Sequence, residues 1–160
     1  MVQKNGNCVR TLTADEYFIL SRGVSIVFLD IRCVAALRLF GAVIPQRMER
    51  LQNIILATKA DLVILSNWGE HFSDEDEVKA AFGEYGLSPV VLGWAGPIRR
   101  GGDVRDYLRE AVIPRKFIIL CCSDDYDEFL PLVLKSEPHY GLRGYDVERS
   151  IQLLIDQEHK

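Results

Sequence analysis

The sequence predicts an α/β protein, a three-layer α/β/α sandwich in which helices cover both faces of a mostly parallel, Rossmann-like sheet. Two observations carry this prediction. Four short apolar runs, rich in β-branched residues, are spaced along the chain, and segments with the periodicity of amphipathic helices lie between them. Near-continuous apolar runs are typical of strands buried on both faces, and strands that alternate with helices form right-handed parallel crossovers.

The N-terminal part of the chain contains one expected helix and one expected strand. Thr13 and Glu16 have the spacing of a capping box, which predicts a helix of about eight residues after a flexible segment at 1–12. Residues 24–31, VSIVFLDI, are apolar almost throughout and form the first expected strand. Such a run has the length of a strand and is too short for a typical helix.

The middle of the chain continues the alternation. Residues 45–60 begin with proline, which suits a first helical turn, and carry apolar residues at helical spacing. The second strand is expected at 62–65. Acidic residues after Ser73 complement the dipole of a further helix, which we expect to end at Gly83 or Gly86.

The remaining part of the chain is expected to hold two more strands and three more helices. The strands are 89–92 and 116–122, both apolar and β-branched. The expected helices are 103–111, 125–134 and 145–156. We find no internal repeat and no linker, so the sequence predicts a single domain over the whole chain, 1–160.

Composition excludes several classes of protein. Apolar residues make up 48% and charged residues 26% of the 160, as in ordinary globular proteins, and the net charge is −4. No apolar run reaches the roughly 18 residues of a membrane span, and no Lys/Arg cluster predicts nucleic-acid binding. The N-terminus lacks the pattern of a secretory signal, so we expect a cytoplasmic protein with reduced cysteines.

Polar side chains follow three of the expected strands. Asp30 follows the first strand, Ser66 and Asn67 follow the second, and residues 121–125 end the fourth. In open α/β sheets, ligands bind beyond the carboxyl ends of the strands. A carboxylate at the end of a buried strand is costly unless it is solvated, paired or used in chemistry, so Asp30 is a candidate functional residue.

The order of these segments resembles a known family, the small haloacid-dehalogenase-like (HAD-like) domain associated with "Swiss Army Knife" RNA-repair proteins. The resemblance covers roughly residues 24–156. It rests on five segments, VFLDI, VILSNW, RRGGDVRDYL, FIILCCSDDYDEF and GLRGYDVERSIQLL. It implies a HAD-like sheet in which the first strand is central and the second and fourth strands lie on either side of it.

The resemblance also implies phosphatase chemistry for particular residues. Asp30 matches the Asp nucleophile that forms an aspartyl-phosphate, a covalent route known for carboxylates. Ser66, with Asn67 beside it, matches the residue that holds a phosphoryl oxygen. Arg100, with Arg99 as a substitute, lies in the segment whose cation neutralises the phosphate.

The sequence departs from the family pattern at two of these motifs. Arg32 stands where the family has a second Asp, and a guanidinium stays protonated near pH 7, so it cannot act as a general acid or base. Cys121 and the two residues after it stand where acidic residues would bind Mg²⁺, and Asp124 and Asp125 come two or three positions late. Thiols are poor ligands for Mg²⁺.

The two substitutions look compensatory, because a guanidinium replaces the charge of a metal. We therefore expect Arg32 to make a charge-assisted contact with Asp30, Asp124 or Asp125. Alternate residues on a strand share a face, which would place Arg32 beside Asp30.

The cysteines give a further expectation. The first and fourth strands are expected to be neighbours, so Cys33 should lie close to Cys121 or Cys122. With His71 or His139 these thiols form a candidate site for a soft metal, although their spacing matches no standard zinc pattern.

Two main functions stay open. One is a catalytically impaired pseudophosphatase that acts as a binding or regulatory module for an unknown protein or a small anionic ligand, without a cofactor. The other is a HAD-type phosphohydrolase or phosphotransferase that uses Asp30 as nucleophile and Mg²⁺ as cofactor. A metal-independent hydrolase on the same scaffold is a third option. A fold does not by itself decide between them.

Overall fold

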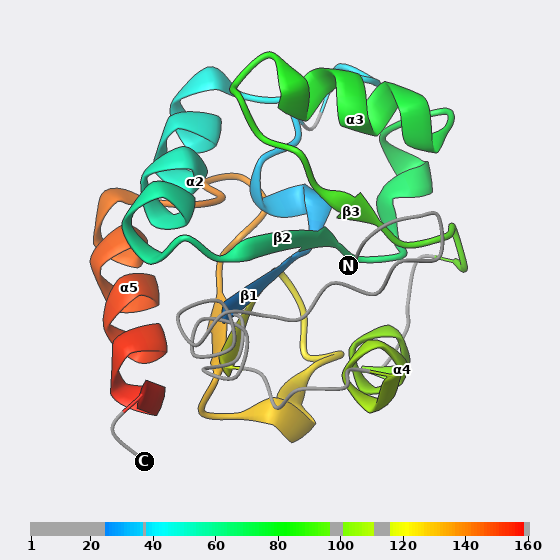
Figure 1. Cartoon of the computed structure of the whole chain (residues 1–160). Helices are drawn as coiled ribbons and strands as arrows, with labels where there is room; N and C mark the ends of the chain where they lie inside the picture. Colours follow the sequence, from blue (N-terminus) through cyan, green and yellow to red (C-terminus); the bar gives the residue numbers. More distant parts are fainter. Residues whose placement is uncertain (1–24, 37, 97–100, 111–115, 159–160) are drawn as a thin grey trace, which may run out of the picture.

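The computed structural model describes residues 25–36, 38–96, 101–110 and 116–158. Its centre is a five-stranded sheet in the order β3-β2-β1-β4-β5, with every pair of neighbouring strands parallel (Figure 1). The strands are β1 (Ser25–Leu29), β2 (Asp61–Ile64), β3 (Val90–Val91), β4 (Lys116–Cys121) and β5 (Val133–Lys135). The predicted α/β class is confirmed, and so is the central position of β1 between β2 and β4.

Helices cover both faces of the sheet. The α-helices are α2 (Pro45–Thr58), α3 (Glu75–Gly83), α4 (Gly102–Glu110) and α5 (Gly144–Glu158). Helices α2, α3 and α5 pack on one face, and α4 lies on the other (Figure 1). Three short 3₁₀ turns are also described, η1 (Ile31–Cys33), η2 (Trp68–Glu70) and η3 (Asp127–Phe129).

The alternation of side chains along β1 explains these layers. Val27 and Leu29 belong to the core beneath α2 and α5, whereas Ile26 and Phe28 belong to the core beneath α4. All four are at most 2% exposed. Because a strand with a helix layer on each face has no solvent-facing side, its sequence is apolar throughout rather than alternating.

The predicted helix over 125–134 is wrong. The structure has the short turn η3 and then the strand β5, in which Val133 and Leu134 pair with β4. Pro131 explains the difference, because a proline in a helix interior removes a hydrogen bond and clashes with the preceding turn. The β-branched and apolar residues after it add a fifth strand to the sheet.

The predicted first strand is too long at its carboxyl end. β1 ends at Leu29, and Ile31–Cys33 form η1, with Asp30 as the residue that caps it. The Asp30 side chain accepts a hydrogen bond from the Arg32 backbone N–H at 2.9 Å. Such local side-chain bonds compete with the sheet ladder and favour turns. Arg32 therefore does not lie on the strand.

Several predictions fall on residues outside those described. These are the flexible segment at 1–12, the helix predicted from Thr13 and Glu16, and the candidate phosphate ligands Arg99 and Arg100. None of the described helices combines the length and the apolar character that a membrane span requires.

Candidate functional site

The candidate site lies where β1, β2 and β4 reach their carboxyl ends. The Asp30 backbone N–H donates to the Leu120 carbonyl at 2.8 Å, and the Leu65 N–H donates to the Leu29 carbonyl at 2.9 Å. Hydrogen bonds of the sheet, from β4 on one side and from the residue after β2 on the other, therefore fix the backbone at Leu29 and Asp30. Asp30 is fully buried, with 0% of its surface exposed, so its carboxylate needs partners within the protein.

Arg32 supplies those partners. Its Nε donates to both Asp30 carboxylate oxygens, at 3.0 and 3.1 Å, and its Nη2 donates to Oδ2 at 2.5 Å. The pKa of Arg32 is raised above its usual value, first by this hydrogen bond, while burial acts in the opposite direction. The predicted contact of Arg32 with Asp30 is therefore present, in a bidentate geometry that a turn rather than a strand produces.

The two aspartates expected to bind Mg²⁺ are engaged elsewhere. Asp124 accepts from Lys135 Nζ at 2.7 Å, and Asp127 accepts from the same nitrogen at 2.6 Å. These two hydrogen bonds raise the pKa of Lys135. Asp125 accepts from the Ser123 hydroxyl at 2.9 Å. Neither Asp124 nor Asp125 contacts the Asp30–Arg32 pair, so the structure does not bring these four side chains together as one site.

The residues present do not fit a Mg²⁺ site of the expected kind. Among the described residues, no group of three or more His, Cys, Asp or Glu side chains is arranged to hold a metal ion. Mg²⁺ requires hard oxygen ligands in nearly octahedral geometry. The donor set at the end of β4 is instead one buried thiol, one partly buried thiol and carboxylates already paired with Lys135 or Ser123.

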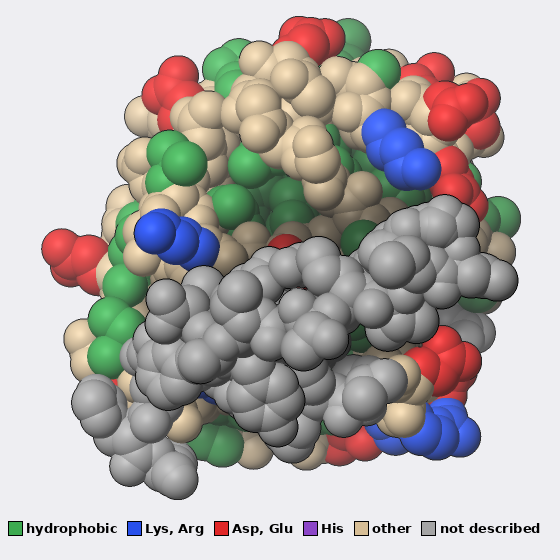
Figure 2. Space-filling view, viewed as in Figure 1, with side chains coloured by type: hydrophobic (Ala, Val, Ile, Leu, Met, Phe, Trp, Pro, Cys, Tyr) green, Lys and Arg blue, Asp and Glu red, His purple; other side chains and the backbone are tan. Residues whose placement is uncertain are grey.

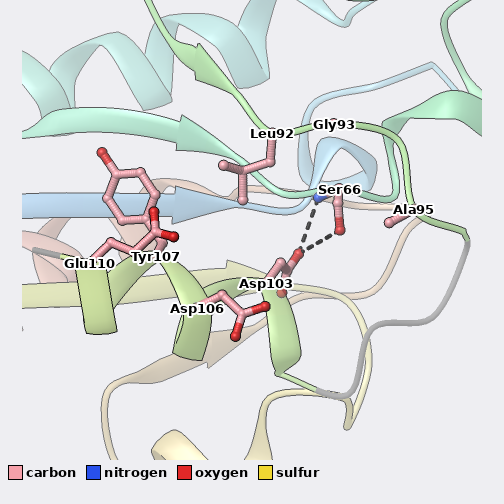
Figure 3. A pocket seen from close by; sticks show the side chains of 8 residues that line it. All are labelled: Ser66, Leu92, Gly93, Ala95, Asp103, Asp106, Tyr107 and Glu110. Carbon is pink, nitrogen blue, oxygen red and sulfur yellow. Dashed lines mark hydrogen bonds between the residues drawn. The ribbon is translucent and has the colours of Figure 1, made fainter.

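Ser66 is bound to a residue that the sequence did not single out. Asp103 Oδ2 accepts from the Ser66 backbone N–H at 3.1 Å, from the Ser66 hydroxyl at 2.9 Å and from the Tyr126 hydroxyl at 3.2 Å. Figure 3 shows Asp103 directly below Ser66, on the first turn of α4. Burial, followed by the charge of Asp103, raises the pKa of Tyr126. A carboxylate therefore occupies the donors that were predicted to hold a phosphate.

A pocket of about 210 Å³ opens beside this contact (Figure 3). Three of its lining residues are acidic, and residues of the segment after β3 line its other side. The lining residues are Ser66, Leu92, Gly93, Ala95, Asp103, Asp106, Tyr107 and Glu110. No Lys or Arg is among these described lining residues, and the Asp103 carboxylate already occupies the Ser66 donors, so they do not provide a phosphate pocket here.

Asn67 has a different environment. It is 5% exposed, and its Oδ1 has no hydrogen-bond partner within the described part of the chain. The next residue, Trp68, donates its indole N–H to the Leu92 carbonyl at 2.6 Å. Trp68 also packs against Trp94, with ring centroids 6.1 Å apart. Tryptophan packing thus fills the end of β2 next to Asn67.

The predicted proximity of the cysteines is confirmed for one pair. Cys33 Sγ and Cys122 Sγ are 3.7 Å apart. The hydrogen bond with Cys122, followed by burial, raises the pKa of Cys33. Cys121 donates its thiol to the Ser123 carbonyl at 3.4 Å, and burial raises its pKa to about 12. The candidate soft-metal site lacks a third ligand, because no described cluster of three metal-ligating side chains includes these thiols.

A buried arginine fastens the loop before α5 to the same end of the sheet. Arg47 of α2 is 6% exposed and donates to the backbone carbonyls of Pro138, at 3.1 Å, and His139, at 2.6 Å. Gly141 follows in a left-handed conformation with φ 55°, and a Cβ there would lie 2.3 Å from the Cys33 carbonyl oxygen. The Leu142 N–H donates to that same carbonyl at 3.1 Å.

Comparison with protein families matches residues 26–147 to the HAD domain in Swiss Army Knife RNA repair proteins. This match covers more than two thirds of the chain. The chain belongs to this family. Comparison with curated proteins and with solved structures gave no match.

The Asp30–Arg32 pair lies within the matched region. Arg32 holds both oxygens of the Asp30 carboxylate. Sequence reasoning found this pair because its members are two residues apart. It missed Asp103, because an aspartate after two glycines is also an ordinary helix-start residue.

Figure 2 shows how side-chain types are distributed on one face of this HAD domain. Hydrophobic side chains gather in the middle of the face, between α2 and α3. On the described part of this face, Lys and Arg side chains are scattered among carboxylates and do not form a basic patch. This distribution agrees with the acidic net charge of −4.

Proposed function

We propose that this HAD domain is a catalytically impaired pseudophosphatase that acts as a binding or regulatory module. The observation that carries the proposal is the bidentate contact of Arg32 with Asp30. The guanidinium takes the place of both the acid/base aspartate and the positive charge of a metal. It cannot donate and recover a proton near neutral pH.

The energy of the pair supports the proposal. Asp30 is 0% exposed, so an open form in which Arg32 leaves would hold an unpaired buried carboxylate. Breaking such a pair costs about 3–5 kcal/mol. At roughly 1.4 kcal/mol for each factor of ten, the open form is disfavoured by about 10²- to 10⁴-fold. A nucleophile that is free so rarely makes a poor phosphatase even before the absent acid/base is counted.

A second pocket supports binding of a small anion. This pocket, of about 220 Å³, lies where β5 ends and α5 begins. Arg143 stacks on Tyr140 with its guanidinium carbon 4.3 Å from the ring centroid, and donates to the Tyr145 hydroxyl at 3.4 Å. Among the described residues, the Arg143 guanidinium contacts aromatic groups and forms no ion pair with a carboxylate, so its charge is available to an anion. The lining residues are Lys135, Ser136, Glu137, Gly141, Arg143, Tyr145 and Asp146.

Activity and binding are measured separately to test the proposal. Purified protein is incubated with a generic aryl phosphate and Mg²⁺, beside the Asp30→Asn variant. We expect no turnover above the rate without protein, and no difference between the two proteins. Turnover that Asp30→Asn abolishes would overturn the proposal. Inorganic phosphate titrated by calorimetry tests the binding function, with Arg143→Gln as the variant expected to bind more weakly.

One observation favours the second candidate function, a HAD-type phosphohydrolase. The Arg32 side chain is 27% exposed, so a substrate phosphate can approach its guanidinium from solvent and compete with Asp30. In that case Arg32 would bind substrate, and Arg32→Ala would lower kcat/KM. If wild type turns over the aryl phosphate and Arg32→Ala does so faster, Arg32 is an inhibitory residue and not a substrate ligand.

A further inference from the structure

Two cysteines far apart in the sequence lie in contact next to the Asp30–Arg32 pair. Cys33 is the last residue of η1, and Cys122 directly follows β4. Their sulfur atoms are 3.7 Å apart, although 89 positions separate them along the chain. The backbones are held beside each other, because Leu29 pairs with Leu120 and the Asp30 N–H donates to the Leu120 carbonyl. A disulfide has an S–S distance of about 2.05 Å, so closure requires a sulfur displacement of under about 2 Å.

The three described cysteines differ in access to solvent. Cys122 is partly exposed, whereas Cys33 and Cys121 are buried. The Cys121 thiol donates to the Ser123 carbonyl, so we do not expect it to form a disulfide with Cys33 or Cys122. The guanidinium groups of Arg32 and Arg47 lie near both thiols. The thiolate is the form that reacts with disulfides, and Cys122 is the thiol of this pair that solvent reaches.

We propose that Cys33 and Cys122 form a redox-active dithiol that closes to a disulfide by exchange with small-molecule disulfides of the glutathione class. The Cys122 thiolate attacks one sulfur of the small disulfide, forming a mixed disulfide and releasing one small thiolate. Cys33 then loses its proton to solvent and attacks Cys122 Sγ, releasing the second small thiolate. Two protein thiols are oxidised and one small disulfide is reduced to two thiols.

The disulfide would act on the candidate site through η1. Cys33 is the neighbour of Arg32 in this turn, and Asp30 caps it. A covalent bond from Cys33 to the end of β4 therefore fastens the turn that carries Arg32 over Asp30. The inference does not depend on the proposed function, since the same turn holds Asp30 whether the domain binds or catalyses.

The test follows thiols and peptides in the full-length protein. A Cys8→Ser background removes the cysteine that lies outside the described residues. This protein is incubated with oxidised glutathione, blocked with an alkylating agent, digested without reduction and analysed by mass spectrometry. We expect loss of two free thiols, a peptide linking Cys33 to Cys122, and an unmodified Cys121. Thermal unfolding of the oxidised form should occur on the order of 10 °C higher, because the bond closes a long loop.

Matched variants distinguish this pair from other reactions. In the same background, Cys121→Ser should still form the linked peptide, and Cys122→Ser should not react with oxidised glutathione at all. Cys33→Ser should stop at the mixed disulfide on Cys122. A Cys121–Cys122 link, a stable mixed disulfide in the parent protein, or four unreacted thiols in the wild type would each overturn the proposal. The parent peptide map decides the matter even if a serine variant fails to fold.

Discussion

Replacing Arg32 should destabilise the protein much more than replacing an exposed arginine. In Arg32→Ala, the fully buried Asp30 carboxylate loses its three side-chain hydrogen bonds and keeps only the backbone N–H of residue 32. Leaving a buried charge unpaired costs about 3–5 kcal/mol. Arg32 is 27% exposed, so water reaches the gap and the lower end, about 3 kcal/mol, applies. Arg32→Asp should be at least as destabilising, because it places a second carboxylate there.

The assay is thermal and urea unfolding of the purified variants, each with and without Mg²⁺. For a chain of this size, about 3 kcal/mol corresponds to a fall in Tm of roughly 6–12 °C. Arg109→Ala is the matched control, because Arg109 pairs with Asp106 at positions 73% and 61% exposed. Such a surface pair contributes about 0–1 kcal/mol. Adding Asp30→Asn to Arg32→Ala should recover much of the lost stability, since a neutral amide replaces the unpaired charge.

Two results would refute this reasoning. An unchanged Tm in Arg32→Asp would mean that the ion pair contributes nothing. A large rise in the Tm of Arg32→Asp on adding Mg²⁺ would mean that the two carboxylates form a working metal site.

Three further outcomes are expected. Asp103→Leu should lower the free energy of unfolding by about 2–3 kcal/mol in urea titrations, because buried donors lose their acceptor, and unchanged stability would contradict this. Gly141→Ala should lower Tm strongly, since its Cβ would lie 2.3 Å from the Cys33 carbonyl oxygen at φ 55°, whereas Gly83→Ala meets no atom within 4 Å and should not. Burial lowers the pKa of His71, so the unfolded chain takes up a proton first and stability should fall as pH drops below about 6.5. His71→Gln should reduce that fall in melts from pH 7.5 to 5.5, and an identical pH profile would exclude His71 as its source.

The strands could be predicted because a strand that is buried on both faces has an almost continuous run of apolar residues in the sequence. The run from Ile26 to Leu29 is apolar for that reason, and it proved to be the central strand. The segment around Pro131 was misread, because the apolar residues that form β5 are few and also match a short helix. Local pattern alone could not show that Val133 pairs with Ile119 of β4.

The site shows the same limit. The Asp30–Arg32 contact lies within one turn, so sequence proximity was enough to predict it, although the expected strand geometry was wrong. Asp103 joins Ser66 and Tyr126, which are 37 and 23 positions away along the chain. Only the packing of α4 against the sheet brings these groups together. A single sequence does not indicate such a contact between side chains that are distant along the chain.

The clamp made by Arg47 has a consequence for synthesis of the chain. Its hydrogen bond to the His139 carbonyl spans 92 positions, and the Arg50 bond to the Leu142 carbonyl also spans 92. While the ribosome is still adding residues before 139, the Arg47 guanidinium has no loop to hold and the Cys33 carbonyl has no Leu142 N–H to accept. These hydrogen bonds at the edge that carries the candidate site therefore cannot form until residues 139–142 have been synthesised, and a nascent chain halted before that point would leave the Arg47 guanidinium and the Cys33 carbonyl without these partners.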